Sequence, residues 1–235
     1  MKTETAFESN KTLHGLDNPI WEALSTLHAG FAQGDSLAKR YPVEVTSLAA
    51  MGAPTPEAFA SLAKTLQRAG AALFLDQLPE IPTGWITIHV GQLAQMVCEK
   101  LPIAPEDFPA VELTAADVPE MVALAGLTQP GPFGVRTREL GQYLGVRQGN
   151  RLAAMAGERL HFRGYTEVSA VCTHPEFQGR GYAGGLMSVV MRGIAQRGET
   201  PLLHVRTENS GAIRLYEKLG FRTRRLIHFV VLRPR

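Results

Sequence analysis

The chain has 235 residues, of which 45% are hydrophobic and 20% are charged. Its Leu, Val, Ile and Phe content is sufficient to bury a sizeable core, which excludes collagen-like, mucin-like and acidic disordered chains. The net charge of +2 is uneven, because residues 1–109 carry 7 basic and 12 acidic side chains (−5) and residues 110–235 carry 17 and 10 (+7). An Arg-rich second half favours a site for an anion, and the alternative is two domains that merely differ in composition.

In the first half, hydrophobic spacing predicts two helices and two strands. The helices are expected over 19–33 and 55–69, and the strands over 71–75 and 85–90. Residues 1–17 are polar and unpatterned. Residues 101–109 contain three prolines, which indicates a linker. We therefore expect an N-terminal α/β domain over 1–109, with a role that the sequence leaves open, and a second domain over 110–235.

In the second half, short strands and helices follow one another at close intervals. Thr114 and Asp117 have the spacing of a capping box, and Gln148-Gly149-Asn150 is a hairpin turn signal. The strands are expected over 111–113, 142–147, 151–162, 165–173, 201–206 and 227–232, and the helices over 114–124, 181–197 and 210–219.

Cys98 and Cys172 lie in apolar stretches, and two cysteines provide neither a disulfide framework nor a zinc site. The first ten residues lack the basic and apolar regions of a signal peptide, and no apolar run approaches the roughly 20 residues of a spanning helix. The basic cluster 222–225 is too short to indicate nucleic-acid binding. The sequence predicts a cytoplasmic protein without a metal, a nucleic-acid partner or a membrane partner.

The segment between the strand 165–173 and the helix that follows carries the clearest chemical signal. Its loop is made of Gln178, Gly179, Arg180, Gly181, Tyr182 and Ala183. Glycines allow tight turns and expose backbone N–H groups, and a helix N-terminus favours an anion. The loop is therefore a predicted phosphate cradle, with Arg180 as an additional cation.

One alternative for this loop is a dinucleotide site. The glycines at 179, 181 and 184 match the spacing of that fingerprint between a strand and a helix. However, five residues separate the strand from the glycines, and the acid about 20 residues on, Glu199, precedes the next strand. This context argues against a nicotinamide-dependent oxidoreductase.

Gln178-x-x-Gly181-x-Ala183 resembles the Q/R-x-x-G-x-G/A signature of the GCN5-related N-acetyltransferases (GNATs), and Asn209-x-x-Ala212-x-x-x-Tyr216 resembles their second signature. The approach to the loop is most similar to the FR47-like branch, and the resemblance covers about 110–235. It implies a mixed, twisted α/β sheet, flanked by helices, whose central strands splay to admit the pantetheine arm of acetyl-CoA.

The resemblance also implies roles for individual residues. The backbone of Val171, Cys172 and Thr173 would pair with the pantetheine amides, with Gln178–Ala183, Asn209 and Ala212 completing the acetyl-CoA site. Cys172 would be a strand residue and not a nucleophile, because an amine attacks the thioester directly. The hydroxyl of Tyr216 would bind beside coenzyme A and protonate the leaving thiolate, and the alternative is a core tyrosine.

The general base that would deprotonate the acceptor amine is less clearly indicated than the general acid. Glu167 lies 11 residues before Gln178, which matches the glutamate base of the histone-acetylating members of the superfamily. On a partly buried strand its pKa would rise enough to deprotonate an ammonium. The alternative is a strand-end glutamate in a surface ion pair. His174, which precedes a proline, is interpreted as loop structure.

These observations predict an N-acetyltransferase that moves acetyl from acetyl-CoA to a small-molecule or peptide amine in a ternary complex. The alternative is a coenzyme A-binding regulatory or interaction module without transfer activity. The acceptor pocket is expected from segments 19–40 and 128–140. The N-terminal region would be a partial acetyltransferase-like half on the acceptor side, a lid or a dimerisation element, so a homodimer is left open.

Overall fold

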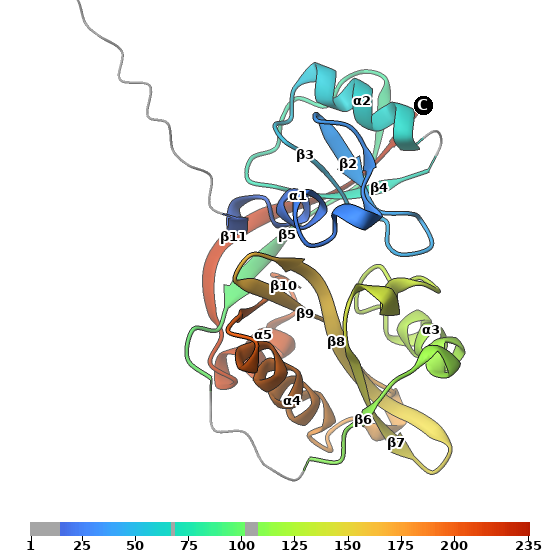
Figure 1. Ribbon diagram of the computed structural model, residues 1–235, viewed down its shortest axis with the longest axis vertical. Helices are drawn as coiled ribbons and strands as arrows, with labels where there is room; N and C mark the ends of the chain where they lie inside the picture. Colours follow the sequence, from blue (N-terminus) through green and yellow to red (C-terminus); the bar gives the residue numbers. More distant parts are fainter. Residues whose placement is uncertain (1–14, 67–68, 102–107) are drawn as a thin grey trace, which may run out of the picture.

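The computed structural model describes residues 15–66, 69–101 and 108–235. An eight-stranded mixed sheet runs through the molecule in the order β4-β11-β5-β10-β9-β8-β7-β6 (Figure 1). Its strands are β4 (Ala71–Leu75), β5 (Trp85–Val97), β6 (Val111–Glu112), β7 (Tyr143–Gln148), β8 (Arg151–Phe162), β9 (Tyr165–Thr173), β10 (Thr200–Arg206) and β11 (Arg222–Pro234). The pair β9–β10 is parallel, and the other neighbours are antiparallel.

The helices lie on both faces of this sheet. The α-helices are α1 (Pro19–Ser25), α2 (Pro56–Leu66), α3 (Val118–Thr128), α4 (Tyr182–Gln196) and α5 (Ser210–Lys218). Helices α4 and α5 cover one face and α3 covers the other (Figure 1). We call these the α4 face and the α3 face. Near the fork between β9 and β10, the α3 face also packs against α1.

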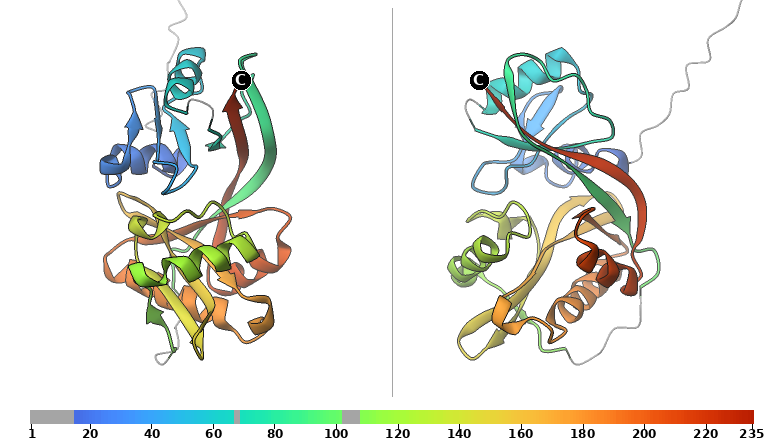
Figure 2. Two further views of the ribbon diagram at one scale, coloured as in Figure 1. Left: turned by 90° about the vertical axis from the view of Figure 1, so that its right-hand side faces the viewer. Right: turned by 180° about the vertical axis from the view of Figure 1, so that it is seen from behind.

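A second, three-stranded antiparallel sheet lies in the upper part of the molecule as drawn in Figure 1, together with α1 and α2, and we call this part the upper lobe. The strands of this sheet are β1 (Gln33–Gly34), β2 (Ala38–Arg40) and β3 (Ala49–Met51). A single bridge between Leu48 and Ala72 joins this region to β4. Strands β5 and β11 are long enough to run from the upper lobe into the lower one, as the view from behind shows (Figure 2). Residues before and after position 109 therefore share one continuous sheet.

Most predicted elements of the second half are confirmed, and β4, β8 and β9 have the predicted bounds. The capping box predicted at Thr114 and Asp117 is formed, and Gly149 turns the β7–β8 hairpin with a φ of +58°. The expected fold class, a mixed α/β sheet with flanking helices, is also confirmed.

The main errors of the prediction lie in the first half. The helix expected over 19–33 ends at Ser25, where Thr26 closes it and the short strands β1 to β3 follow. In the second half, the strand expected over 227–232 spans Arg222–Pro234, because β5 pairs with it over that whole length. Of the linker expected over 101–109, residues 102–107 lie outside the described residues.

Candidate functional site

The parallel strands β9 and β10 pair only where they begin. Their register runs from Tyr165 with Thr200 to Glu167 with Leu202. Beyond that point, within the described chain, β9 pairs only with β8 and β10 only with β5. The two strands therefore form a fork, with Glu167 at its base, and the predicted splayed strands are confirmed.

Strand β9 is bulged along one arm of this fork. Its register against β8 shifts between Ser169 and Cys172, and Ala170 has a φ of +51°. A non-glycine residue in this region is strained, and such bulges occur beside functional sites, where they take backbone groups out of the ladder. Val171 and Thr173, two of the predicted contacts to pantetheine, lie in or just beyond the bulge.

At the end of β9, the predicted phosphate cradle leads into α4. Gly179 and Gly181 have φ values of +77° and +76°, and a Cβ at either would have no atom within 4 Å. Glycine is therefore required by the left-handed backbone and not by crowding. Gly185 N donates to Gly181 O at 3.0 Å, so the N–H groups of Tyr182 and Ala183 lie ahead of this bond at the helix start. The backbone has the geometry that a phosphate cradle needs.

The charge beside the cradle is positive. The guanidinium of Arg180 lies 5.2 Å from the centre of the Phe177 ring, and no described carboxylate is within ion-pair distance of it. The guanidinium of Arg151 also lies 5.2 Å from the centre of this ring, but it forms an ion pair with Glu176 at 2.6 Å. Arg180 is thus the cation available to an anion in the cradle, while Gln178 precedes the turn in extended backbone.

Helix α5 brings the second signature against the first. The Asn209 side chain accepts a hydrogen bond from Ala212 N at 3.1 Å and so fixes the start of the helix. A Cβ at Gly184 would lie 3.4 Å from Leu215 Cδ1, which places α5 directly against the start of α4. Burial raises the pKa of the adjacent Tyr216 to about 12, so its hydroxyl is a proton donor at neutral pH.

Cys172 has the environment of a structural residue. Its side chain is buried on the α3 face with Met155 and Ala170. Burial raises the pKa of the thiol to about 11, so the thiolate form needed for nucleophilic attack is rare at neutral pH.

Glu167 is fully buried in an ion pair that the sequence did not predict. Arg159 donates from Nε and Nη2 to its two oxygens at 2.8 and 2.7 Å. His204 Nδ1 lies 2.7 Å from Glu167 Oε1. Burial alone raises the pKa of this carboxyl, but Arg159 and His204 outweigh it and hold the pKa at about 2. The expected rise in pKa is therefore wrong, because strands β8 and β10 bring a cation and a hydrogen-bond donor to the carboxylate.

The network continues away from the fork. Gln95 Nε2 donates to Leu16 O at 2.8 Å and lies 3.1 Å from His204 Nε2, while its Oε1 accepts from Arg224. These partners leave Nε2 of His204 as the acceptor and Nδ1 as the donor to Glu167. Sequence spacing did not indicate Arg159, His204 or Gln95, because each lies on a different strand.

The two segments predicted to build the acceptor pocket meet on the α3 face. His28, in the first segment, bonds Tyr41 at 2.8 Å, and its ring lies 5.3 Å from that of His161. Burial lowers the pKa of His28 to about 4, His161 adds to this, and a hydrogen bond with the carbonyl of Leu140, in the second segment, opposes it. Both segments therefore border the strand β8 that carries Arg159.

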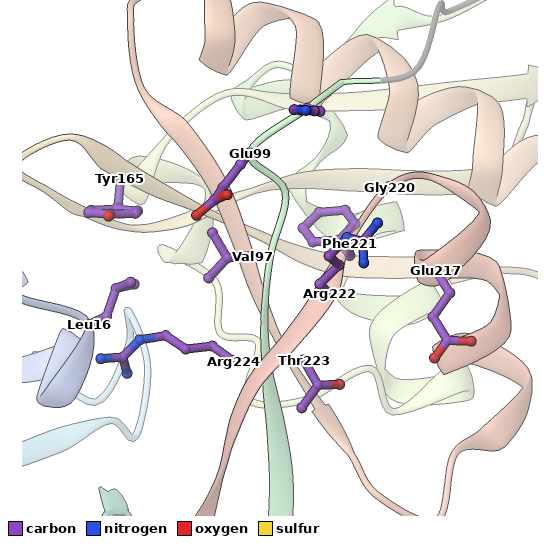
Figure 3. A pocket seen from close by; sticks show the side chains of 11 residues that line it. Leu16, Val97, Glu99, Tyr165, Glu217, Gly220, Phe221, Arg222, Thr223 and Arg224 are labelled. Atoms are coloured by element: carbon purple, nitrogen blue, oxygen red, sulfur yellow. The ribbon is translucent and has the colours of Figure 1, made fainter.

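A cavity of about 1120 Å³ lies at the other end of β9, where that strand begins (Figure 3). Glu99, Arg222 and Arg224, near the ends of β5 and β11, contribute charges of both signs to its wall. Tyr165 lines it, whereas the cradle begins after Thr173 at the opposite end of the same strand. This cavity is separate from the fork and the cradle.

The described residues, 15–66, 69–101 and 108–235, include five α-helices. None of the helices there combines the length and the apolar character that crossing a membrane would demand. In the same residues, no three His, Cys, Asp or Glu side chains are placed to hold a metal ion.

The family model of the FR47-like protein matches residues 143–230. A GNAT-family protein from Novosphingobium aromaticivorans is 40% identical, with 95% of this chain and 100% of that chain covered and a TM-score of 0.88. A GCN5-related N-acetyltransferase from Kribbella flavida shares the fold at 16% identity, with 92% and 95% covered and a TM-score of 0.62. No curated protein matches the sequence.

Proposed function

This chain belongs to the GNAT family of acetyltransferases, and we propose that it transfers the acetyl group of acetyl-CoA to an amine in a ternary complex. The observation that carries the proposal is the fork between β9 and β10, which ends at a glycine-rich helix start. A slot between strands suits a narrow chain with amide groups, and the helix start suits the pyrophosphate. Coenzyme A has both parts.

In this proposal the backbone binds most of the coenzyme. The free edge of β9 at Val171, Cys172 and Thr173 pairs with the pantetheine amides. The N–H groups of Gly179 to Ala183 take the pyrophosphate, with Gln178 at the turn and Arg180 as the counter-charge. Asn209 and Ala212 hold the start of α5 against the thioester end of the coenzyme.

The reaction needs no covalent intermediate on the protein. The acceptor nitrogen attacks the thioester carbon, the new C–N bond forms, and the C–S bond breaks to release the thiolate. Tyr216 donates its phenolic proton to that sulfur, and solvent restores it. The excess proton of the amine leaves to water.

Glu167 has a revised role in this proposal. A carboxylate with a pKa of about 2 is too weak a base to take a proton from an ammonium of ordinary pKa. It stays ionised, however, and although Arg159 balances its charge, its oxygens keep a lone pair that can accept a hydrogen bond from the acceptor amine at the base of the fork. Glu167 thus orients the acceptor by hydrogen bonding instead of accepting the proton itself.

The binding half of the proposal is tested by titrating the protein with acetyl-CoA in a calorimeter. We expect saturable one-to-one binding, and the absence of heat at millimolar acetyl-CoA would sink the proposal. The transfer half is tested with a broad amine panel by following free thiol release. Tyr216→Phe should lower kcat on the order of 100-fold while acetyl-CoA affinity stays unchanged.

The same measurements separate the alternative. A coenzyme A-binding module without transfer activity would bind acetyl-CoA but release no thiol with any amine of the panel. For the N-terminal region, over 1–109, we propose a partial acetyltransferase-like half on the acceptor side, because α1 and the segment after it pack against the strand that carries Arg159.

A further inference from the structure

Arg159 has hydrogen-bonding capacity that its ion pair does not use. Its side chain is 8% exposed, and its bonds to described residues use only Nε and Nη2, both toward Glu167. A guanidinium has five N–H groups, so those of Nη1 remain. Gly131, in the loop after α3, faces this nitrogen, since a Cβ there would lie 3.9 Å from it. A glycine places no side chain over Nη1.

Tyr143 contributes a second unused group on the same face. The residue is 1% exposed, and its hydroxyl has no hydrogen-bond partner in the described part of the chain. The ring is held across Gly157, where a Cβ would lie 2.3 Å from it, and packs edge-on against Phe133 at 5.7 Å. A buried hydroxyl without a partner costs about 1–3 kcal/mol. Its rigid support indicates that a ligand supplies the partner.

The two groups lie together and beside the fork. Tyr143 pairs with Gly157 and lies over it, and Arg159 is two residues further along β8, so both side chains lie on the same face of the sheet. Tyr143 also packs with Ala170 and Cys172, the bulged part of β9. Its position is therefore on the α3 face, across the sheet from α4.

The charges around Arg159, Glu167 and Tyr143 restrict what these side chains can bind. Arg159 and Glu167 together are neutral, and one further buried charge of either sign would have no full counter-charge. An acceptor with both an ammonium and a carboxylate adds no net charge. Its carboxylate would meet the donors of Arg159 and Tyr143, and its ammonium would meet the carboxylate of Glu167.

We propose that Arg159 and Tyr143 form a carboxylate subsite, and that the acceptor is an amino acid acetylated on its amine. This inference rests on the proposed acetyl transfer and names its acceptor class.

The test compares acceptors that differ only at the carboxylate. Free thiol release is measured with acetyl-CoA and L-amino acids, their C-terminal amides and their decarboxylated amines. We expect kcat/KM for the acids to exceed that for the amides and amines on the order of 100-fold. If acetyl-CoA binds in the calorimeter but amides or amines react as well as the acids, or no acid reacts, the subsite is wrong and the coenzyme site stands. Failure to bind acetyl-CoA overturns the proposed function itself.

A substitution in the subsite tests whether the preference for a carboxylate arises there. Arg159→Gln would leave Glu167 as an unpaired buried charge, so Tyr143→Phe is the informative change, because it removes only an unbonded hydroxyl. We expect KM for the acid acceptor to rise on the order of 10-fold. The kinetics with amides and the affinity for acetyl-CoA should not change. Tyr165→Phe, at the start of β9 and outside the proposed subsite, is the control and should leave the preference for the acid over the amide unchanged. Equal losses for acid and amide, or no change in either, would contradict the subsite.

Discussion

At the scale of single residues, several buried polar groups on the α3 face have partners among one another. Glu167 has Arg159 and His204, and His28 has Tyr41 and the carbonyl of Leu140. Removing one side chain of such a set leaves the other unpaired in a medium of low dielectric constant. The loss in folding free energy is then larger than the net contribution of the bond itself. The bond between His28 and Leu140 also links the first half of the sequence to the second.

Acid should destabilise the protein through His28. His28 titrates near 6.5 when unfolded and at about 4 when folded, so the unfolded chain binds the proton first. Stability is then full above pH 6.5 and falls as the pH drops toward 4, by about 3 kcal/mol. Urea unfolding at a series of pH values measures this slope.

His28→Gln should remove most of the slope above pH 5, and His161, whose pKa burial also lowers, contributes in the same direction. His89→Gln, at an exposed position of β5, is the control for the loss of a histidine as such. An unchanged slope in His28→Gln would show that the proton is taken up elsewhere.

At the scale of elements, the start of α4 depends on two glycines for its backbone. The strand–loop–helix order of this segment was predictable, because glycine spacing and helix periodicity are local properties. The surroundings of Glu167 were not, because Arg159 and His204 reach it from neighbouring strands whose register is a property of the whole sheet. The residues of the cradle were thus predictable and those of the acceptor side were not.

Gly181→Ala tests the cradle at this scale. A left-handed backbone costs a residue with a Cβ about 1–2 kcal/mol, and no atom crowds the new Cβ, so the exposed loop relaxes and its N–H groups move. We expect acetyl-CoA affinity to fall on the order of 10-fold in calorimetry. Gly198→Ala, with the same φ of +76° and the same open surroundings after the other end of α4, is the control. It should lower stability without changing affinity, and equal affinities in both variants would argue against the cradle.

At the scale of the whole molecule, one sheet connects both halves of the sequence. β5 lies between β10 and β11, and β11 lies between β4 and β5. The change in composition near residue 109 therefore does not divide the structure into two separate sheets. The first and second halves were predicted as domains from composition and prolines alone, which are silent on the long-range pairing of strands.

Because one sheet joins both halves, the second half of the chain should not fold without the first. Residues 108–235 alone lack β5, so both β10 and β11 lose a neighbour, and we expect no cooperative thermal transition by circular dichroism. Coexpression with residues 1–101 should restore a soluble one-to-one complex with that transition. A cooperative transition in the 108–235 fragment alone would show that the second half folds by itself.

The position of β11 between β4 and β5 also has a consequence for the time course of folding. Its partners on β5 precede it by more than 100 residues, so the slot that it fills stays open until most of the chain has been made. Long-range strand pairing of this kind is slow. Until β11 is inserted, the facing edges of β4 and β5 are unpaired, and on the ribosome they are the surface that a chaperone would have to shield from other chains.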